Sequence, residues 1–180
     1  LETLEYRDKK KIKYATLDAA KQIDNLEEKT KQLFNGSDEA GDFYRTVFTD
    51  VFSYVSYRIP EISDEVYRID DALRAGFGWE LGAFESWDAV GVAEAAAIAK
   101  ERGHAVASWV DEMLATGNNT FYRVVDGKRE CYDPSTKEYK VIPGQEGRVN
   151  LKYISDDKVV WSNSGTTIKD IGDGIVNIEF

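Results

Sequence analysis

The chain has 180 residues, with 33 acidic and 23 basic side chains and a formal net charge of −10. A chain of this length can bury roughly 70% of the surface that its unfolded form exposes, so it needs neither a disulfide nor a metal to hold a core. The acidic balance disfavours nucleic acid and anionic membrane surfaces as partners, because both attract clustered Lys and Arg.

From about Tyr14 to Thr116 the apolar residues recur with a helical period. The apolar residues between positions 17 and 33 predict a helix from Tyr14 to Phe34, because they are three or four residues apart and charged residues fill the intervals. Asn35-Gly36 is expected to end this helix. Ser37 is expected to cap the next one. The apolar set is Leu17, Ala20, Ile23, Leu26 and Leu33.

The second predicted helix runs to about Arg58 and is expected to be the most buried element. Its apolar residues surround more than half of the helix, and Pro60 ends it, because the residue before a proline avoids helical geometry. These apolar residues are Phe43, Tyr44, Val47, Phe48, Val51, Phe52, Tyr54 and Val55.

Four further helices are predicted before residue 117. The first begins after the cap at Ser63-Asp64-Glu65 and ends near Gly76, which is expected to adopt a left-handed conformation. The others cover 84–90, 93–102 and 105–115, and Gly103 separates the last two.

After Asn119 the apolar pattern alternates, which is typical of strands. Asp126-Gly127 lies between two alternating segments and predicts a tight hairpin, because both central residues of a type I′ turn need positive φ. Further strands are predicted at 139–142, 151–154, 159–161 and 175–178. The sequence thus predicts a mainly α fold, with a helical domain over residues 1–117 and a β-rich linker region over residues 118–180.

Cysteine and histidine usage restricts the chemistry. The single cysteine, Cys131, cannot form an intrachain disulfide, which favours a reducing, cytoplasmic setting. The single histidine, His104, excludes His-rich zinc sites and H-E-x-x-H metalloproteases. No apolar run approaches the roughly 20 residues that span a bilayer. We interpret Lys9-Lys10-Lys11 as a solvated segment.

The glycine-rich block from Gly76 to Gly91 is the most distinctive stretch. Gly76, Gly78 and Gly82 resemble a loosened dinucleotide loop, but such a loop should follow a buried strand, whereas these glycines follow a predicted helix. One interpretation makes the aromatic residues of the block core anchors, and the alternative makes the block a contact surface. We therefore predict no cofactor or metal site in the chain. The aromatic residues are Phe77, Trp79, Phe84 and Trp87.

Paired carboxylates occur at Asp70/Asp71, Glu80/Glu85 and Asp156/Asp157. General acid–base catalysis needs a carboxyl group in an apolar environment. Adjacent acids on a helix surface are usually solvated, so we expect these pairs to be solvated. No serine or cysteine has a neighbouring base, and no G-x-S-x-G motif occurs.

Three segments form a long and unusual motif: 57–64 (YRIPEISD), 69–80 (IDDALRAGFGWE) and 82–91 (GAFESWDAVG). Together they resemble the C-terminal helical domain of L-3-hydroxyacyl-CoA dehydrogenases, and more closely the bacterial form fused to an enoyl-CoA hydratase. The family pattern Gly-Pro-Phe-Glu is replaced by Gly82-Ala83-Phe84-Glu85, which removes a fixed φ at a helix start. Residues 170–180 resemble the first strand of a crotonase-type hydratase domain.

The resemblance implies a part of an enzyme of fatty-acid β-oxidation that transfers a hydride from a 3-hydroxyacyl-CoA to NAD. Nothing in the chain matches the family's dinucleotide loop or its catalytic histidine segment, so the isolated chain is expected to be inactive and to bind no NAD itself. The helical domain is expected to close the acyl-CoA cleft and to contact neighbouring domains. Candidate contact residues are Gly76, Phe77, Gly78, Trp79, Glu80, Gly82, Phe84, Glu85, Trp87 and Asp88.

The partners implied by this resemblance are the dinucleotide-binding and hydratase domains of the same polypeptide and the acyl-CoA substrate. A second copy of the chain, in a homodimer, is a further candidate partner. Two other functions are kept as alternatives. The chain could be a free-standing helical module that binds a protein partner through its aromatic residues. The weakest hypothesis is a hydrolase that uses Glu80 and Glu85.

Overall fold

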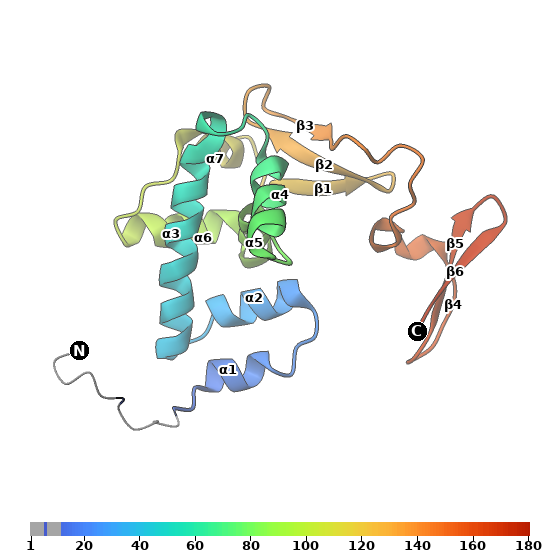
Figure 1. Cartoon of the computed structure of the whole chain (residues 1–180), viewed down its shortest axis with the longest axis horizontal. Coiled ribbons are helices and arrows are strands. Elements are labelled where there is room, and N and C mark those ends of the chain that lie inside the picture. Colours follow the sequence, from blue (N-terminus) through green and yellow to red (C-terminus); the bar gives the residue numbers. More distant parts are fainter. Residues whose placement is uncertain (1–5, 7–11) are drawn as a thin grey trace.

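The computed structural model describes residue 6 and residues 12–180, so Lys9-Lys10-Lys11 lies outside the described part. Helices come first and strands follow (Figure 1), so the fold is mainly α with a small β part, as predicted. The helices are α1 (Ala15–Ala20), α2 (Leu26–Phe34), α3 (Glu39–Glu61), α4 (Val66–Phe77), α5 (Ala83–Val90), α6 (Val92–Glu101) and α7 (Ser108–Ala115). The strands are β1 (Tyr122–Val125), β2 (Lys128–Asp133), β3 (Glu138–Val141), β4 (Val159–Ser162), β5 (Thr167–Gly172) and β6 (Ile175–Glu179).

The predicted helix from Tyr14 to Phe34 is wrong, because the segment forms two helices. The Asn25 side chain accepts a hydrogen bond from the Glu28 backbone N–H at 2.9 Å and so starts α2 after a break. The expected cap at Ser37 is also wrong. Asp38 caps α3, accepting from the Gly41 N–H at 3.1 Å. Ser37 and Asp38 are both of residue types that commonly cap helices, so the sequence alone does not distinguish between them.

Helix α3 is less buried than its composition predicts. Regular geometry is interrupted at Ile59, before Pro60, as expected from the proline. Phe43, Val47 and Tyr54 are nonetheless exposed. The prediction that this helix is the most buried is therefore wrong, and the short helix α5 carries the centre of the core instead.

The ends of the other helices match the predictions or differ from them by up to three residues. Helix α4 continues through Gly76 to Phe77, and its C-cap residue Gly78 has a φ of +68°. The left-handed conformation predicted for Gly76 is therefore wrong by two residues. Helix α7 begins at Ser108 and not at Ala105, because the Ala107 N–H donates to the Ser56 hydroxyl and the preceding backbone is extended.

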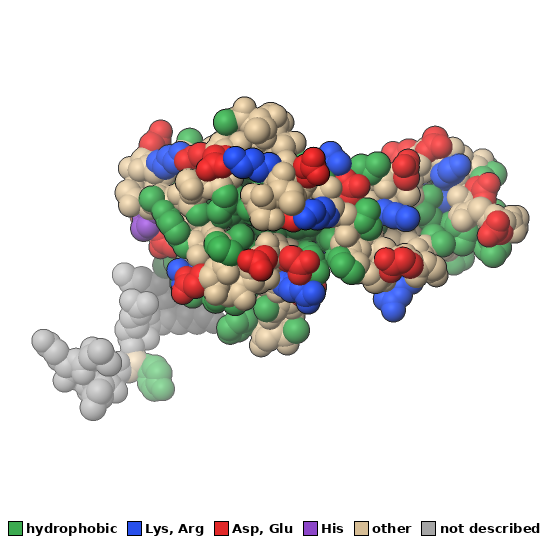
Figure 2. Space-filling model, turned by 90° about the horizontal axis from the view of Figure 1, so that it is seen from above, with side chains coloured by type: hydrophobic (Ala, Val, Ile, Leu, Met, Phe, Trp, Pro, Cys, Tyr) green, Lys and Arg blue, Asp and Glu red, His purple; other side chains and the backbone are tan. Residues whose placement is uncertain are grey.

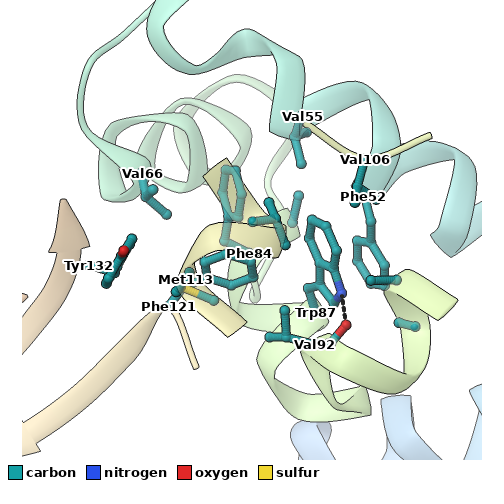
Figure 3. Close-up of a cluster of buried hydrophobic side chains, with 14 of the residues drawn as sticks. Phe52, Val55, Val66, Phe84, Trp87, Val92, Val106, Met113, Phe121 and Tyr132 are labelled. Carbon is teal, nitrogen blue, oxygen red and sulfur yellow. Dashed lines mark hydrogen bonds between the residues drawn. The ribbon is translucent and has the colours of Figure 1, made fainter. Parts of the chain in front are cut away.

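The core is built around Phe84 and Trp87 of α5 (Figure 3). The Trp87 ring stacks on the Phe52 ring, with centroids 4.9 Å apart and planes 4° apart. Its indole N–H donates to the Val92 carbonyl at 3.1 Å, so the polar atom of this buried ring is satisfied. Phe121, which precedes β1, packs against the rings of Phe84 and Trp87, with centroid distances of 4.9 and 5.1 Å. The core therefore extends from the helices into the β part.

Two antiparallel sheets, with strand orders β1-β2-β3 and β4-β5-β6, make up the β part. The predicted hairpin at Asp126-Gly127 is confirmed, with φ of 50° and 72° at the two turn residues. The predicted strand at 151–154 is wrong, because residues Leu151–Tyr153 form a 3-10 helix. No helix of the described residues is long and apolar enough to cross a bilayer.

Candidate functional site

The glycine-rich block lies where α4 turns into α5. Phe77 and Trp79, on either side of the left-handed Gly78, are 76% and 40% exposed. Glu80 is exposed as well. The loop 77–80 therefore presents two aromatic rings and a carboxylate to solvent at the end of a well-packed helix.

The carboxylate of Asp70 fixes the start of α5, which follows this loop. Asp70 is fully buried on α4 and accepts hydrogen bonds from the backbone N–H groups of Phe84 at 2.9 Å and Glu85 at 3.0 Å. It thus caps α5 from another helix, because the N-cap residue Gly82 has no side chain to do so. A Cβ on Gly82 would overlap the Asp70 carboxyl group, so this approach requires glycine.

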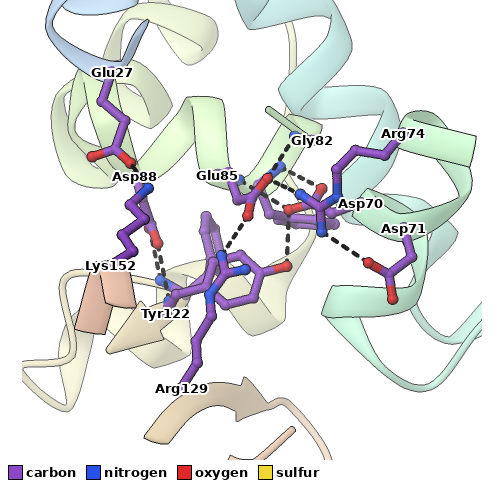
Figure 4. Close-up of polar contacts among 12 residues, drawn as sticks. Glu27, Asp70, Asp71, Arg74, Gly82, Glu85, Asp88, Tyr122, Arg129 and Lys152 are labelled. Atoms are coloured by element: carbon purple, nitrogen blue, oxygen red, sulfur yellow. Dashed lines mark hydrogen bonds and ion pairs between the residues drawn. The ribbon is translucent and has the colours of Figure 1, made fainter. Parts of the chain in front are cut away.

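Glu85 completes the start of α5 and links it to the first sheet (Figure 4). One of its oxygens accepts the Gly82 N–H at 2.7 Å and pairs with Arg74 of α4. The other pairs with Arg129 of β2 at 2.6 Å. The Arg129 guanidinium in turn lies 3.8 Å from the centre of the Tyr122 ring. This half-buried ion-pair network joins α4, α5 and β2.

Two carboxylates, one buried and one half-buried, fasten β1 to the helices. Asp88 accepts the backbone N–H groups of Phe121 at 2.7 Å and Tyr122 at 2.9 Å. The Tyr122 hydroxyl donates to Asp70 at 2.8 Å. Strand β1 is thereby held by side chains from both α4 and α5. We call the set Asp70, Arg74, Glu85, Asp88, Tyr122 and Arg129 the polar junction.

Burial raises the pKa values of both carboxyl groups in the polar junction. The pKa of Asp70 is raised to about 6 and that of Asp88 to about 7, although the N–H donors on each favour the charged form and oppose the shift. The prediction that Asp70 is solvated is wrong, whereas Asp71 is exposed and pairs with Arg74 at 2.8 Å. Asp156 and Asp157 are exposed, as expected.

A polar cavity of about 370 Å³ lies beside the polar junction, and Glu85, Asp88 and Arg129 line it. Lys152 and Glu27 also line it and pair with each other at 2.8 Å. Because Asp88 already accepts two backbone N–H groups and Glu85 is held by two arginines, these carboxylates are engaged in holding the fold. Their arrangement suits positioning of backbone better than proton transfer.

The structure divides the ten predicted contact residues into two groups. Gly82, Phe84 and Trp87 are buried, and Glu85 and Asp88 belong to the polar junction. The exposed group is Gly76, Phe77, Gly78, Trp79 and Glu80. Sequence reasoning missed Arg74, Tyr122 and Arg129, because residues of separate helices and strands give no local signal of their meeting.

His104 and Cys131 are two further groups with catalytic potential. The His104 ring nitrogen lies 3.0 Å from the Asp50 carboxylate between α6 and α3, and both side chains are partly exposed. Cys131 is buried and free, and burial raises the pKa of its thiol to about 12, which disfavours the reactive thiolate. Among residues 12–180 no group of three or more His, Cys, Asp or Glu side chains could hold a metal ion.

The glycine block does not fit a dinucleotide. Its glycines follow α4 rather than a strand, and the N-terminus of α5 is already occupied by the Asp70 carboxylate, which would repel a phosphate. No binding step for such a cofactor is therefore assigned to these residues.

Comparison with known proteins identifies three relatives. Over 179 residues, 99% of the chain, the sequence is 36% identical to a probable 3-hydroxyacyl-CoA dehydrogenase of Bacillus subtilis (strain 168). A stretch of 59 residues, 29% of the chain, is 30% identical to a putative fatty acid oxidation complex trifunctional enzyme of Rickettsia felis, and a similar protein of Rickettsia prowazekii is 26% identical over 54 residues, 30% of the chain. The chain spans 22% of the length of the Bacillus relative and 8% of each of the others. No family model and no solved structure matches.

Proposed function

We propose that this chain, a relative of the 3-hydroxyacyl-CoA dehydrogenases over 99% of its length, is a non-catalytic helical part of such an enzyme. In this role it closes the acyl-CoA cleft and packs against neighbouring domains of the same polypeptide. The NAD and the catalytic histidine belong to a dinucleotide-binding domain outside this sequence. A hydratase domain is a further neighbour.

One observation carries the proposal: the loop 77–80 exposes its aromatic rings, while hydrogen bonds and ion pairs hold the start of α5 directly after it. Phe77 and Trp79 face solvent, and the polar junction fixes the start of α5 through Asp70. Exposed aromatic residues on a fixed backbone suit a contact surface, because they bury much apolar area with little loss of conformational freedom. The carboxylates behind the loop are occupied by backbone N–H groups, which supports a positioning role.

The assignment of the chemistry is tested by activity. We expect the purified 180-residue chain to reduce no NAD with 3-hydroxybutyryl-CoA, and the longer natural polypeptide that contains this sequence to do so. Activity of the 180-residue chain alone would contradict the proposal, and so would a longer polypeptide that is folded but inactive with 3-hydroxyacyl-CoA substrates.

The contact surface is tested by substitution in the longer polypeptide. Phe77→Ala and Trp79→Ala should lower kcat/KM by about tenfold or more, because misplacing a cleft wall disturbs the alignment of the reacting groups. Phe43→Ala is the matched control, since it removes an exposed aromatic ring from α3, far from the loop in sequence. An equal loss in all three variants would refute the special role of the loop.

A free-standing interaction module is the alternative, and the exposed residues of α3 favour it. Phe43, Val47 and Tyr54 are spaced by four and seven residues, so they share one side of the helix, and all three are exposed. Under this alternative the gene encodes no dehydrogenase, and Phe43→Ala weakens partner binding more than Phe77→Ala does.

A further inference from the structure

Helix α3 carries a line of exposed side chains in the part of the chain that the structure describes. Its members follow one another at spacings of four, three, four and three residues, which is the 3.5-residue repeat of a seam between two helices. Four of the five are large apolar or aromatic side chains. The line ends before the break in helical geometry at Ile59. We call this set the α3 seam: Phe43, Val47, Asp50, Tyr54 and Tyr57.

The exposed apolar area of the α3 seam has the size of an interface core. Phe43, Tyr54 and Tyr57 are 63%, 60% and 46% exposed. Together these three rings leave roughly 340 Å² uncovered, since a Phe or Tyr side chain has about 200 Å² of surface. A stable complex buries about 800 Å² on each partner, of which somewhat more than half is apolar. The α3 seam therefore supplies most of the apolar area that a stable dimer needs. Figure 2 shows hydrophobic side chains exposed beside the histidine at this end of the molecule.

Two rings of the α3 seam are held in place by neighbouring groups. The Tyr57 hydroxyl donates to the Val106 carbonyl at 3.4 Å, in the segment between α6 and α7. The Arg58 guanidinium lies 4.7 Å from the centre of the Tyr54 ring. Side chains that are already ordered lose little conformational freedom on binding, which favours association.

The α3 seam is symmetric about its own middle. Phe43 and Tyr57 lie seven residues on either side of Asp50, and Val47 and Tyr54 lie three and four residues from it. When a second copy of α3 lies antiparallel, with a two-fold axis beside Asp50, Phe43 meets Tyr57 of the other copy and Val47 meets its Tyr54. Each apolar residue then contacts an apolar residue. A two-fold contact requires this self-complementarity, because both copies use the same surface, whereas a surface for an unrelated protein does not.

The charges of α3 favour the antiparallel arrangement. Asp42 and Arg58 each lie eight residues from Asp50, so the two-fold axis places Arg58 of one copy beside Asp42 of the other. A parallel pair would instead place each of these charges beside its own kind, which is unfavourable. The Asp50 carboxylate near the axis is already paired with the His104 ring at 3.0 Å, so two unpaired carboxylates do not meet there.

We propose that the α3 seam is the contact surface for a second copy of this chain, whose own α3 packs antiparallel across a two-fold axis. The 3.5-residue repeat implies that the two helices cross at about 20°. The inference goes beyond the proposed function, because it names a surface and a partner outside the polypeptide. It does not depend on the reaction that the polypeptide catalyses.

Analytical ultracentrifugation of the natural polypeptide that contains this sequence tests the pairing. We expect a reversible dimer, and we expect Tyr54→Ala to raise its dissociation constant about 30-fold or more, as for a central aromatic residue of an interface. Trp161→Ala is the matched control, since it removes an exposed aromatic ring from β4, and it should leave the dissociation constant unchanged. A monomer at all concentrations would overturn the proposal, and so would equal weakening by the two variants.

Cross-linking tests the geometry of the pair. Asp50→Cys places a thiol beside the two-fold axis, so a short bismaleimide should join two copies of this variant. Phe43→Cys alone should give little product, because the two introduced thiols lie about 21 Å apart along an antiparallel pair. A mixture of Phe43→Cys and Tyr57→Cys should give the mixed dimer. The native Cys131 is buried and should not compete.

The same experiment can refute the arrangement. Equal yields from Phe43→Cys alone and from Asp50→Cys would indicate a parallel pair, and no product from any variant would indicate that the seam holds no second copy. Either result would overturn the proposal.

Two further results separate this inference from its competitors. A polypeptide that stays monomeric, but binds a different protein through Tyr54, would assign the α3 seam to that protein and overturn the proposal. A dimer that Tyr54→Ala dissociates, in a polypeptide without dehydrogenase activity, would refute the proposed function while supporting the pairing. An active monomer would do the reverse.

Discussion

The two sheets are alike locally and differ in what covers them. Each has three antiparallel strands, and each contains a two-residue Asp-Gly turn with positive φ at both positions, Asp126-Gly127 in the first and Asp173-Gly174 in the second. Phe121, Cys131 and Tyr132 tie the first sheet into the helical core. The second sheet has no buried residue. Turn chemistry and alternation are therefore enough to pair strands, and a covering layer decides whether a sheet contributes to the stability of the domain.

The polar junction adds a second difference. Asp88 of α5 accepts the backbone N–H groups of Phe121 and Tyr122, and Asp70 of α4 accepts the Tyr122 hydroxyl, so the first sheet is attached by hydrogen bonds as well as by packing. For this reason we propose that the stable helical domain extends beyond residue 117 and includes the first sheet.

The largest expected effect comes from removing the aromatic ring that joins the first sheet to the core. Phe121→Ala should lower the free energy of unfolding by about 3–5 kcal/mol, the usual cost of emptying a buried Phe site. Trp161→Ala in the second sheet should change it by no more than about 0.5 kcal/mol. Urea unfolding followed by circular dichroism measures both, and similar losses would contradict the contrast between the sheets.

A smaller loss is expected at the polar junction. Asp70→Asn replaces a carboxylate that accepts three hydrogen bonds by an amide that cannot serve all three donors, which should cost about 1–3 kcal/mol. Asp71→Asn is the control, because it removes only an exposed ion pair with Arg74 and should cost about 0.5 kcal/mol or less. Equal unfolding midpoints for the two variants would show that the buried carboxylate does not hold the junction.

The pH dependence of the free energy of unfolding should reveal the raised pKa of Asp88. Burial raises the pKa of Asp88 to about 7, so between about pH 4 and pH 7 the folded chain binds more protons at this site than the unfolded chain does. This site therefore contributes stability at low pH that is lost as the pH rises through 7. In Asp88→Asn the decline from pH 5 to pH 8 should be shallower by at least about 1 kcal/mol. Urea titrations at pH 5 and pH 8 measure the free energy of unfolding of the parent chain and of the variant. An equal decline in the two proteins would contradict the raised pKa of Asp88.

The smallest effects come from the two turns. Gly127→Ala and Gly174→Ala each place a Cβ at positive φ, with φ of 72° and 74°, at a local cost of about 1 kcal/mol. We expect Gly127→Ala to lower the main thermal transition, because the first sheet unfolds with the core. Gly174→Ala should only speed amide exchange in β5 and β6. A lowered main transition in Gly174→Ala would show that the second sheet is coupled to the core.

Local patterns allowed much of the fold to be predicted. The periodicity of the apolar residues located most helices, and the Asp-Gly turn located the first hairpin. The same dipeptide at 173–174 was a usable signal for the second hairpin, which was not predicted as such. Helix ends were less predictable, because Gly76 and Gly78 are equally able to adopt positive φ and only the packed helix selects the second.

The candidate site was predictable only in part. The sequence identified the glycine-rich block as distinctive. It did not predict which residues of the block are buried and which are exposed. Asp70 was expected in solvent, because adjacent acids on a helix usually lie there. Its burial depends on the absence of a side chain at Gly82 and on the arrival of Tyr122 from 52 residues away.

By itself, then, the sequence determined the order of helices and strands, the turn geometry and the resemblance to 3-hydroxyacyl-CoA dehydrogenases, since these depend on residues close together in the chain. Only the tertiary structure decided which aromatic rings form the core, which carboxylates join the sheet to the helices, and which sheet lacks a covering layer. The physical reason is that burial is a property of the neighbours that a residue meets in space, and those neighbours come from distant parts of the chain.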